Sequence, residues 1–453
     1  MRRFKSIILK MQGHNKKDLH LLYNTLSDIE PPKVYDYSGL KFWFAGTGWR
    51  TSEKLLLYVE IPGRFLPGSL LPGREMSGQS TATDVHAETG QSTGTGLPEE
   101  NGLPQETYLL RLLSPAIAEL SESYVNIDKN VREKAQFEVQ KAGEYMIRRS
   151  GMRYDREKEA YILRMNFNVP LVNALSVNAK AAVRAVRDIL DTIETALKEA
   201  DPEELERYIR TYEVQCRIRR FMKEHDMCAF IGDGSILPRE NGTAAPMQDA
   251  VPFVAPEELA VWIPLSENSG REIRGMGIRK GVTVITGGGY SGKSTLLDAI
   301  EMGIYDHIPG DGREFVLTED SALKVYAEDG RPVSGLDLSP FFRFLPGKAP
   351  LRSYTTPHAS GSVSQAANII EAVCGKCCLL LIDEDKSATN FMIRDKNMRH
   401  IVRDEPIIPF TDRVRELYEK EEVSTILVIG GSSEYLACAD TVLLLVLCGA
   451  VRW

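Results

Sequence analysis

The stretch TGGGYSGKST, residues Thr286–Thr295, fits two glycine patterns at once. Gly287, Gly289 and Gly292 satisfy G-x-G-x-x-G, the dinucleotide-binding pattern, and the same stretch contains G-x-x-x-x-G-K-[ST], the P-loop pattern. A β-branched run, GVTVIT, precedes it, and STLLDAIEMGI, with helical spacing, follows it. A strand, a glycine loop and a helix are the context that both patterns require, so the context does not choose between them.

The residues after Gly292 favour the P-loop. A dinucleotide-binding loop continues with apolar helix residues, whereas Lys293 and Ser294 follow here. A lysine at this position reaches β- and γ-phosphates, and a serine hydroxyl can ligate Mg²⁺. Backbone N–H groups of the loop and the helix N-terminus complete an anion site. We therefore expect ATP to be bound by Gly287, Gly288, Gly289, Tyr290, Ser291, Gly292, Lys293, Ser294 and Thr295.

An acidic element follows downstream, in CCLLLIDED. Cys378–Ile382 is typical of a buried strand, and Asp383 stands at its carboxyl end. We expect Asp383 to hold Mg²⁺ together with Ser294, and Glu384 to orient or deprotonate the attacking water. A strand that ends in a solvated acidic turn is the alternative, and the upstream P-loop disfavours it. The pattern predicts an ATPase with Glu384 and Lys293 as catalytic residues and Mg²⁺ as its metal.

The composition is that of a soluble protein with several domains. With 453 residues, the chain is too long for one core, and we expect two or three domains. A formal net charge of −8 means that contact with nucleic acid requires a local basic patch. The longest apolar run, Val442–Val451, is about half as long as a membrane-spanning helix, so no membrane association is expected.

The cysteines and the N-terminal residues bear on the compartment. Seven cysteines, an odd number, fit reduced thiols in a reducing compartment, and we expect a cytoplasmic protein. The start, MRRFKSIILK, is basic and lacks acidic residues, which weakly resembles a transit peptide. A mitochondrial location is therefore the alternative.

Composition and periodicity predict the domains. Short β-rich runs alternate with helical runs in residues 241–453, which predicts an α/β P-loop NTPase domain. Residues 1–72 and 106–240 predict an α+β domain before it, with an alternating strand at Tyr161–Val169 and an amphipathic helix after it. Residues 73–105, rich in Ser, Thr, Gly and Glu, contain too few apolar residues to offset the ordering entropy, so we expect a disordered insertion.

A basic helix is expected after DPEE, where Asp201 suits an N-cap and Pro202 the first helical position. Its positive residues are Arg207, Arg210, Arg217, Arg219, Arg220 and Lys223. A solvated basic face is the simpler interpretation, and a stripe that binds nucleic acid is the alternative.

Further stretches carry a resemblance to a known family. Ser387 and Ala388, in DKSATN, match the start of the D-loop of ABC-type ATPases. The SGS of ASGSVSQAANIIEA resembles the ABC signature turn at a helix N-terminus, which would bind the γ-phosphate held by a partner subunit. With the P-loop region and STILVIGGSSEYLACADTVLL, these stretches closely resemble the predicted ATPases of the ABC class over about Phe230–Leu445.

The resemblance implies an ABC-type nucleotide-binding domain in a soluble, non-transporter ATPase. It also implies a head-to-tail homodimer that ATP clamps shut, in which Ser360, Gly361 and Ser362 of each subunit close the other subunit's site. In one relative, a kinetoplastid mitochondrial protein associated with RNA editing, the dimer encloses a basic pore proposed to hold RNA. RNA is therefore a candidate partner of the clamp.

The chain departs from the ABC pattern at several points. ABC transporters carry a histidine after the strand that follows the acidic pair, whereas Thr425–Ile429 is followed by Gly430, Gly431, Ser432 and Ser433. We therefore expect slow hydrolysis, and the alternative function is an RNA-binding module with ATP as a structural ligand and negligible turnover. The Q-loop glutamine is not obvious, and Asp329 or Asp337 stands in its neighbourhood. Relatives continue beyond Trp453, so we expect the family's C-terminal region to be missing.

Three other features are assigned structural roles. Cys374, Cys377 and Cys378 are interpreted as buried thiols rather than a zinc or redox site, because no second cysteine pair lies at ligand spacing. His307 is interpreted as an ordinary loop histidine rather than a phosphate contact. Trp262 is interpreted as a core residue rather than an adenine-stacking one.

Overall fold

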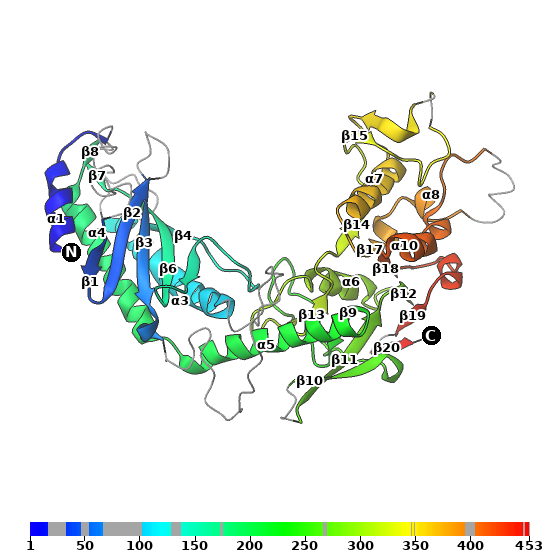
Figure 1. Ribbon diagram of the computed structural model, residues 1–453, viewed down its shortest axis with the longest axis horizontal. Coiled ribbons are helices and arrows are strands. Elements are labelled where there is room, and N and C mark those ends of the chain that lie inside the picture. Colours follow the sequence, from blue (N-terminus) through cyan, green and yellow to red (C-terminus); the bar gives the residue numbers. More distant parts are fainter. Residues whose placement is uncertain are drawn as a thin grey trace, which may run out of the picture. The chain divides into compact units, whose positions relative to one another are not determined.

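The computed structural model describes residues 1–16, 33–46, 54–66, 102–127, 137–172, 175–265, 270–345, 347, 349–394, 404–446 and 449–452. The chain divides into two compact units, Met1–Glu213 and Val214–Trp453 (Figure 1). Both units combine helices and strands, and the second contains a largely parallel sheet. The predicted class, an α/β P-loop fold preceded by an α+β domain, is confirmed.

Along the chain, the division between the two units falls after Glu213, which is earlier than the predicted boundary between residues 240 and 241. Helix α5 (Pro202–Glu224) crosses the division, and its second half packs within the P-loop unit, where the buried Gln215 donates Nε2 to His307 O at 2.7 Å. Strand β9 (Met227–Gly232) pairs in that unit as well. The predicted insertion at 73–105 lies outside the described residues except at its end, where helix α3 already begins at Leu103.

An antiparallel sheet is the framework of the first unit, in the order β1-β2-β3-β6-β4, with β5 also paired to β6. Its strands are β1 (Tyr35–Tyr37), β2 (Leu40–Gly46), β3 (Lys54–Pro62), β4 (Phe137–Val139), β5 (Met152–Asp155) and β6 (Ala160–Asn168), and a small hairpin joins β7 (Leu171–Val172) to β8 (Ser176–Val177). In β6 the predicted alternation is confirmed, because Tyr161, Leu163, Met165 and Phe167 are all buried.

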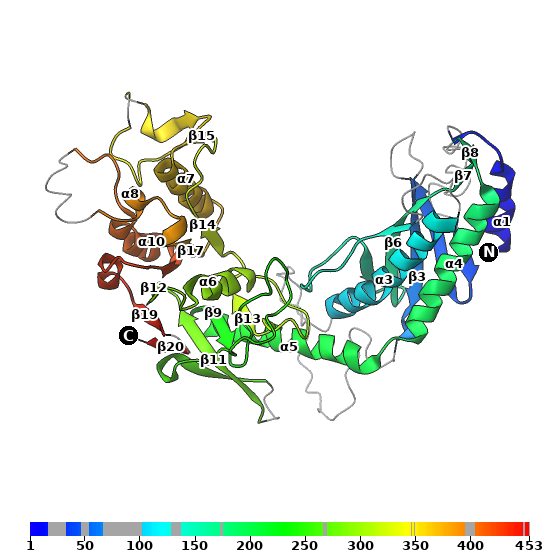
Figure 2. The same ribbon diagram turned by 180° about the vertical axis from the view of Figure 1, so that it is seen from behind.

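The α-helices that the structure describes in the first unit are α1 (Arg2–Ile8), α3 (Leu103–Ile127), α4 (Ala179–Lys198) and the start of α5. Figure 2 shows α3 and α4 lying side by side in front of the sheet, and α3 contacts β4 and β5. The Asn178 side chain caps α4 by accepting a hydrogen bond from Ala181 N at 3.1 Å. The predicted amphipathic face of α4 is confirmed by the burial of Val183, Val186, Ile189, Leu190, Ile193 and Leu197.

The central sheet of the second unit has the order β14-β17-β18-β12-β19-β20, parallel except for the β19–β20 pair. Its strands are β12 (Val282–Gly287), β14 (Leu323–Val325), β17 (Leu379–Asp383), β18 (Ser424–Val428), β19 (Thr441–Val446) and β20 (Gly449–Arg452). The strand before the P-loop is β12 and the strand before the acidic pair is β17, with β18 between them. Because parallel strands end at one edge of a sheet, the carboxyl ends of β12 and β17 face the same edge.

Both faces of this sheet are covered. Leu379 and Leu381 of β17 pack in a cluster with helix α6 (Lys293–Met302), whereas Leu380 and Ile382 pack in another with helix α7 (Gly361–Cys374). Burial on both faces explains why these strands are continuous apolar runs. The other strands and α-helices described in this unit are β10 (Ala260–Pro264), β11 (Glu272–Arg279), β13 (Val316–Thr318), β15 (Val333–Leu336), β16 (Tyr354–Thr356), α8 (Thr389–Met392) and α10 (Val414–Glu421).

A second sheet, antiparallel in the order β10-β11-β9-β13, completes the P-loop unit. Side chains of β9 and β11, such as Ile231 and Met276, belong to the same cluster as α6. Across the described residues, none of the helices is both long and apolar enough to span a bilayer.

Candidate nucleotide-binding site

The glycines of the loop are not equivalent. Gly287 has a φ of 151°, and a Cβ atom there would lie 2.3 Å from Leu445 O of β19, so no side chain fits. Gly292, which caps α6, has a φ of 91°, a left-handed conformation that favours glycine. Around Gly289 a Cβ atom would meet nothing within 4 Å, and its φ is not positive. The two glycines that the backbone requires, Gly287 and Gly292, belong to both patterns, whereas Gly289, which only the dinucleotide pattern needs, is not required by the backbone; this agrees with the P-loop interpretation.

Lys293 is folded back over its own loop. Its ammonium donates hydrogen bonds to Gly287 O and Gly288 O, both at 2.8 Å, at the N-terminus of α6. The free N–H groups at a helix start favour an anion there. Ser291 Oγ is buried in the loop without a hydrogen-bond partner, and Tyr290 is fully exposed with a φ of 60°. The arrangement places one cation and several N–H donors around a single small site.

The two predicted metal ligands meet across the sheet edge. Ser294 Oγ donates to Asp383 Oδ2 at 3.3 Å, although 89 positions separate the residues. Asp383 is only 3% exposed, and its other oxygen accepts a hydrogen bond from Asp385 N at 3.2 Å. A hydroxyl and a carboxylate are oxygen donors of the kind that Mg²⁺ prefers, so the residues present fit that ion.

Glu384 begins a 3-10 turn after β17, and a loop from the neighbouring strand holds its carboxylate. Oε2 accepts a hydrogen bond from Gly430 N at 2.6 Å and a long one from Gly431 N at 3.5 Å. These two residues follow β18, where ABC transporters place a histidine. At the position of that histidine, this chain has glycines, and their backbone N–H groups contact Glu384.

Ser360, Gly361 and Ser362 form the start of α7. Ser360 is the N-cap residue, with extended backbone and no capping bond from its side chain. A Cβ atom at Gly361 would lie 3.0 Å from Asp329 Oδ1 and 3.6 Å from Ala388 Cβ. The turn therefore packs against the segment that follows β14 and against Ala388, which follows the acidic pair. Of the two acids considered near the Q-loop position, Asp329 is the one beside this turn.

Two contacts of the site could not be read from the sequence. The Gly430 contact is made by a backbone N–H, which no residue type signals, and Gln365 lies within the quoted stretch ASGSVSQAANIIEA but outside its SGS turn, with no role assigned to it. Gln365 is fully buried and bonds to Ser387 and Ala388. Local spacing does not identify either contact, because each joins segments that are distant along the chain.

The structure changes the interpretation of the basic helix. Arg219 donates to Asp306 Oδ1 at 3.0 Å, to Asp320 Oδ1 at 2.7 Å and to three backbone carbonyls, with only a fifth of its side chain exposed. It therefore holds the segment after α6 in place and does not belong to a nucleic-acid stripe. Arg207, Arg210, Arg220 and Lys223 are exposed, and Arg217 is half-buried.

One structural assignment from the sequence is wrong, and another is right for only one of its three residues. Trp262 is 57% exposed on β10, with the guanidinium of Arg274 5.7 Å from its ring, so it is not a core residue. Of the three clustered cysteines only Cys377 is buried, whereas Cys374 and Cys378 are exposed. The Trp262 error arises because a β-rich run does not reveal which of its faces is covered, and the cysteine error because residue type alone does not determine exposure.

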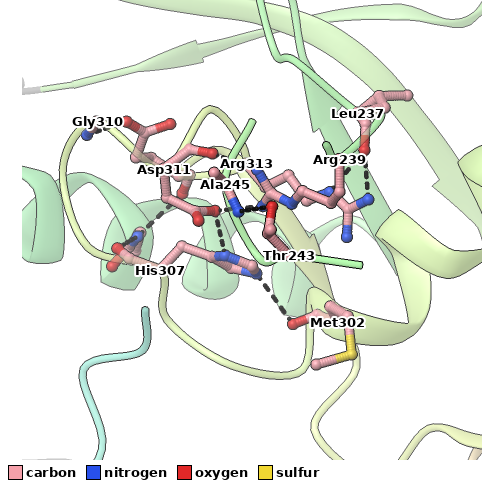
Figure 3. A network of polar contacts seen from close by, with 11 residues as sticks. Leu237, Arg239, Thr243, Ala245, Met302, His307, Gly310, Asp311 and Arg313 are labelled. Atoms are coloured by element: carbon pink, nitrogen blue, oxygen red, sulfur yellow. Dashed lines mark hydrogen bonds and ion pairs between the residues drawn. The ribbon is translucent and has the colours of Figure 1, made fainter. Parts of the chain in front are cut away.

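His307 lies in a buried polar network and not at the phosphate position. Figure 3 shows His307 and Arg239 pointing toward Asp311, whose Oδ2 lies 2.6 Å from His307 Nδ1 and 2.6 Å from Arg239 Nη2. His307 Nε2 also lies 3.2 Å from Met302 O. Burial raises the pKa of Asp311, but the His307 hydrogen bond and the Arg239 charge outweigh burial, so the pKa is lower than usual. These contacts link the loop between α6 and β13 to Arg239, which lies after β9.

We expect Asp311→Asn to lower the free energy of unfolding by about 3 kcal/mol at neutral pH, because Arg239 loses its buried counter-charge. The folded-state pKa of Asp311 is depressed, so this contribution is complete above the unfolded pKa of about 3.9 and is lost as the pH falls through the folded value. Urea unfolding of both proteins over this pH range measures it. A difference that does not shrink toward acid pH would contradict the assignment.

A family model and one curated relative match parts of this chain. The family model of the ABC_ATPase P-loop domain matches residues 201–447. An uncharacterised protein of Methanocaldococcus jannaschii is 33% identical over 227 residues, which are 48% of this chain and 50% of that protein. The chain thus spans about half the length of the curated relative it matches.

Two solved structures are similar to this chain at lower sequence identity. One is a metal-chelate type ABC transporter in an inward-facing conformation, with 17% identity and a TM-score of 0.31 over 50% of this chain and 83% of that one. The other is cbiO1 from Clostridium perfringens, part of the ABC transporter complex cbiONQ, with 14% identity and a TM-score of 0.30 over 50% of this chain and 87% of that one.

Proposed function

This chain belongs to the ABC_ATPase P-loop family, and on that premise we propose that it binds ATP with Mg²⁺ and hydrolyses it slowly to ADP and phosphate. The observation that carries the proposal is the contact between Ser294 Oγ and Asp383 Oδ2, beside Lys293. It joins the P-loop to the acidic strand end, the two elements that a Mg²⁺–triphosphate requires together.

The residues of the site have separate roles in this proposal. Lys293 would exchange the carbonyls of Gly287 and Gly288 for β- and γ-phosphate oxygens, since these offer a stronger partner for an ammonium. Ser294 and Asp383 would hold Mg²⁺, which neutralises phosphate charge. Glu384, held by Gly430 N, would orient the attacking water and accept its proton.

We infer a head-to-tail homodimer as the working form. The start of α7, a helix of 14 residues, offers free N–H groups at Ser360, Gly361 and Ser362, and such a helix start attracts phosphate. In this arrangement each subunit's turn would close the nucleotide site of the other. ATP binding would then clamp the dimer on a partner, and hydrolysis would release it.

RNA is the partner class that we propose for the clamp, on the strength of the family resemblance and of the exposed basic residues of α5. An RNA-binding module with ATP as a structural ligand remains the second candidate, and Gly430 in place of a histidine supports it. The two functions differ in turnover, so a rate measurement separates them.

Steady-state phosphate release, with and without single-stranded RNA, tests the function. We expect Mg²⁺-dependent release slower than about 1 s⁻¹, the lower end of ordinary turnover, and abolished by EDTA or by Asp383→Asn. ATP binding without any release would favour the second candidate. If the protein binds no RNA and RNA does not change the rate of phosphate release, the proposed RNA partner is contradicted and the proposed ATPase activity is not.

A further inference from the structure

Gln365 is a fully buried amide on α7, one turn after the Ser360–Ser362 turn. A primary amide is costly to bury unless its donors and its acceptor find partners. Of its neighbours on the helix, Ala366 and Ala367 are buried and apolar, whereas Ser364 is a buried hydroxyl that bonds to Gly361 O and Glu328 N. The partners of the amide show what it does.

Both ends of the Gln365 amide contact the same short segment. Nε2 donates to Ser387 Oγ at 2.9 Å, and Oε1 accepts from Ala388 N at 2.8 Å. Nε2 also lies 3.4 Å from Met392 Sδ, on α8. The orientation of the amide follows from these partners, because a backbone N–H can only donate.

The contact continues to the metal-binding strand end. Ser387 Oγ donates to Asp383 O at 2.7 Å, and the side chain of Asp383 accepts from Ser294 Oγ at 3.3 Å. Hydrogen bonds therefore link Gln365 on α7, through Ser387, to the backbone of Asp383, and the side chain of the same Asp383 bonds to the P-loop helix.

We propose that Gln365 is a positioning residue of the ATPase. It fixes the Ser387–Ala388 segment so that Asp383 and Glu384 stay aligned with the P-loop, and it links that alignment to α7. This inference rests on the proposed function. In the proposed dimer, the start of α7 contacts the nucleotide that the partner subunit binds. Gln365 therefore couples that nucleotide site to the nucleotide site of its own subunit.

The test replaces the amide by an apolar side chain of similar size, in Gln365→Met. We expect kcat for ATP to fall about tenfold or more, while the affinity for ATP stays within about threefold of the wild type. Asn368→Leu is the matched control, since this amide lies on the same helix and bonds to Tyr326 O and Glu328 Oε2. The control should keep the wild-type kcat.

Variants of Ser387, the more exposed partner in the contact with Gln365, provide a second test. Ser387→Ala should lower kcat as Gln365→Met does, Ser387→Thr should restore it, and the double variant should be little worse than either single one. If Gln365→Met does not fold, these variants decide the question alone.

The outcomes separate the inference from the function. A wild-type protein that hydrolyses ATP, with kcat unchanged in folded Gln365→Met and in Ser387→Ala, would overturn the inference alone. Equal losses of kcat in Gln365→Met and Asn368→Leu would reduce Gln365 to a structural residue. A wild-type protein that neither binds nor hydrolyses ATP would overturn the proposed function, and the positioning role with it.

Discussion

Lys293→Ala should raise the dissociation constant for ATP by about a thousandfold or more, which is about 4 kcal/mol of binding free energy. The ammonium would make charge-assisted contacts with two phosphates, each worth about 2 kcal/mol, and alanine replaces neither. Titration calorimetry with ATP and Mg²⁺ measures the loss. In the absence of nucleotide the variant also loses two bonds to Gly287 O and Gly288 O, so its unfolding must be measured alongside.

Lys280 offers the matched control for this experiment. It lies just before β12, at the amino end of the strand that leads to the P-loop, and its side chain is exposed, with the ammonium 4.0 Å from Asp226 Oδ1. Lys280→Ala removes the same charge at the other end of the β12–P-loop segment and should leave ATP affinity unchanged. ATP affinity that survives Lys293→Ala would remove the P-loop assignment and all roles that depend on it.

Glu384→Gln should lower kcat by about a thousandfold or more, since general-base catalysis contributes up to about 10⁴. Gln keeps an oxygen for the hydrogen bond from Gly430 N, so the loop after β18 should not move. ATP would then bind and persist, and the subunits should remain clamped. Single-turnover hydrolysis measures the first effect, and light scattering with ATP and Mg²⁺ measures the mass of the trapped dimer.

Asp385 is the control for Glu384, because it is the next acidic residue and its side chain is exposed. Asp385→Asn should hydrolyse ATP at the wild-type rate. An ATP-bound Glu384→Gln protein that stays monomeric would exclude the clamp, although the ATPase could stand without it. RNA captured with the trapped dimer, and not with the nucleotide-free protein, would identify the partner class.

Part of the site was predictable because its information is local. Lys293 and Ser294 directly follow the glycine loop, and Asp383 directly follows an apolar strand, so short patterns identify them. The pairing of these two patterns could be expected from the chemistry of a Mg²⁺–triphosphate. The contact between Ser294 and Asp383 agrees with that expectation.

Other features were not predictable because they depend on which faces are covered. Arg219 belongs to a row of basic residues in the sequence, yet it faces Asp306 and the carbonyls after α6. Trp262 belongs to a β-rich run, yet its ring is exposed. A helical or strand period indicates that faces exist, and the packing of distant segments determines what each face meets.

By itself, the sequence determined the α/β class, the P-loop and the position of the acidic pair, since strand, loop and helix preferences act over a few neighbouring residues. Only the tertiary structure decided that β18 lies between β12 and β17, that Leu445 O leaves room for nothing but glycine at position 287, and that Gly430 N and Gln365 hold the acidic segment. These contacts join residues far apart along the chain. Which distant groups meet depends on how the whole sheet is assembled, and no local pattern contains that information.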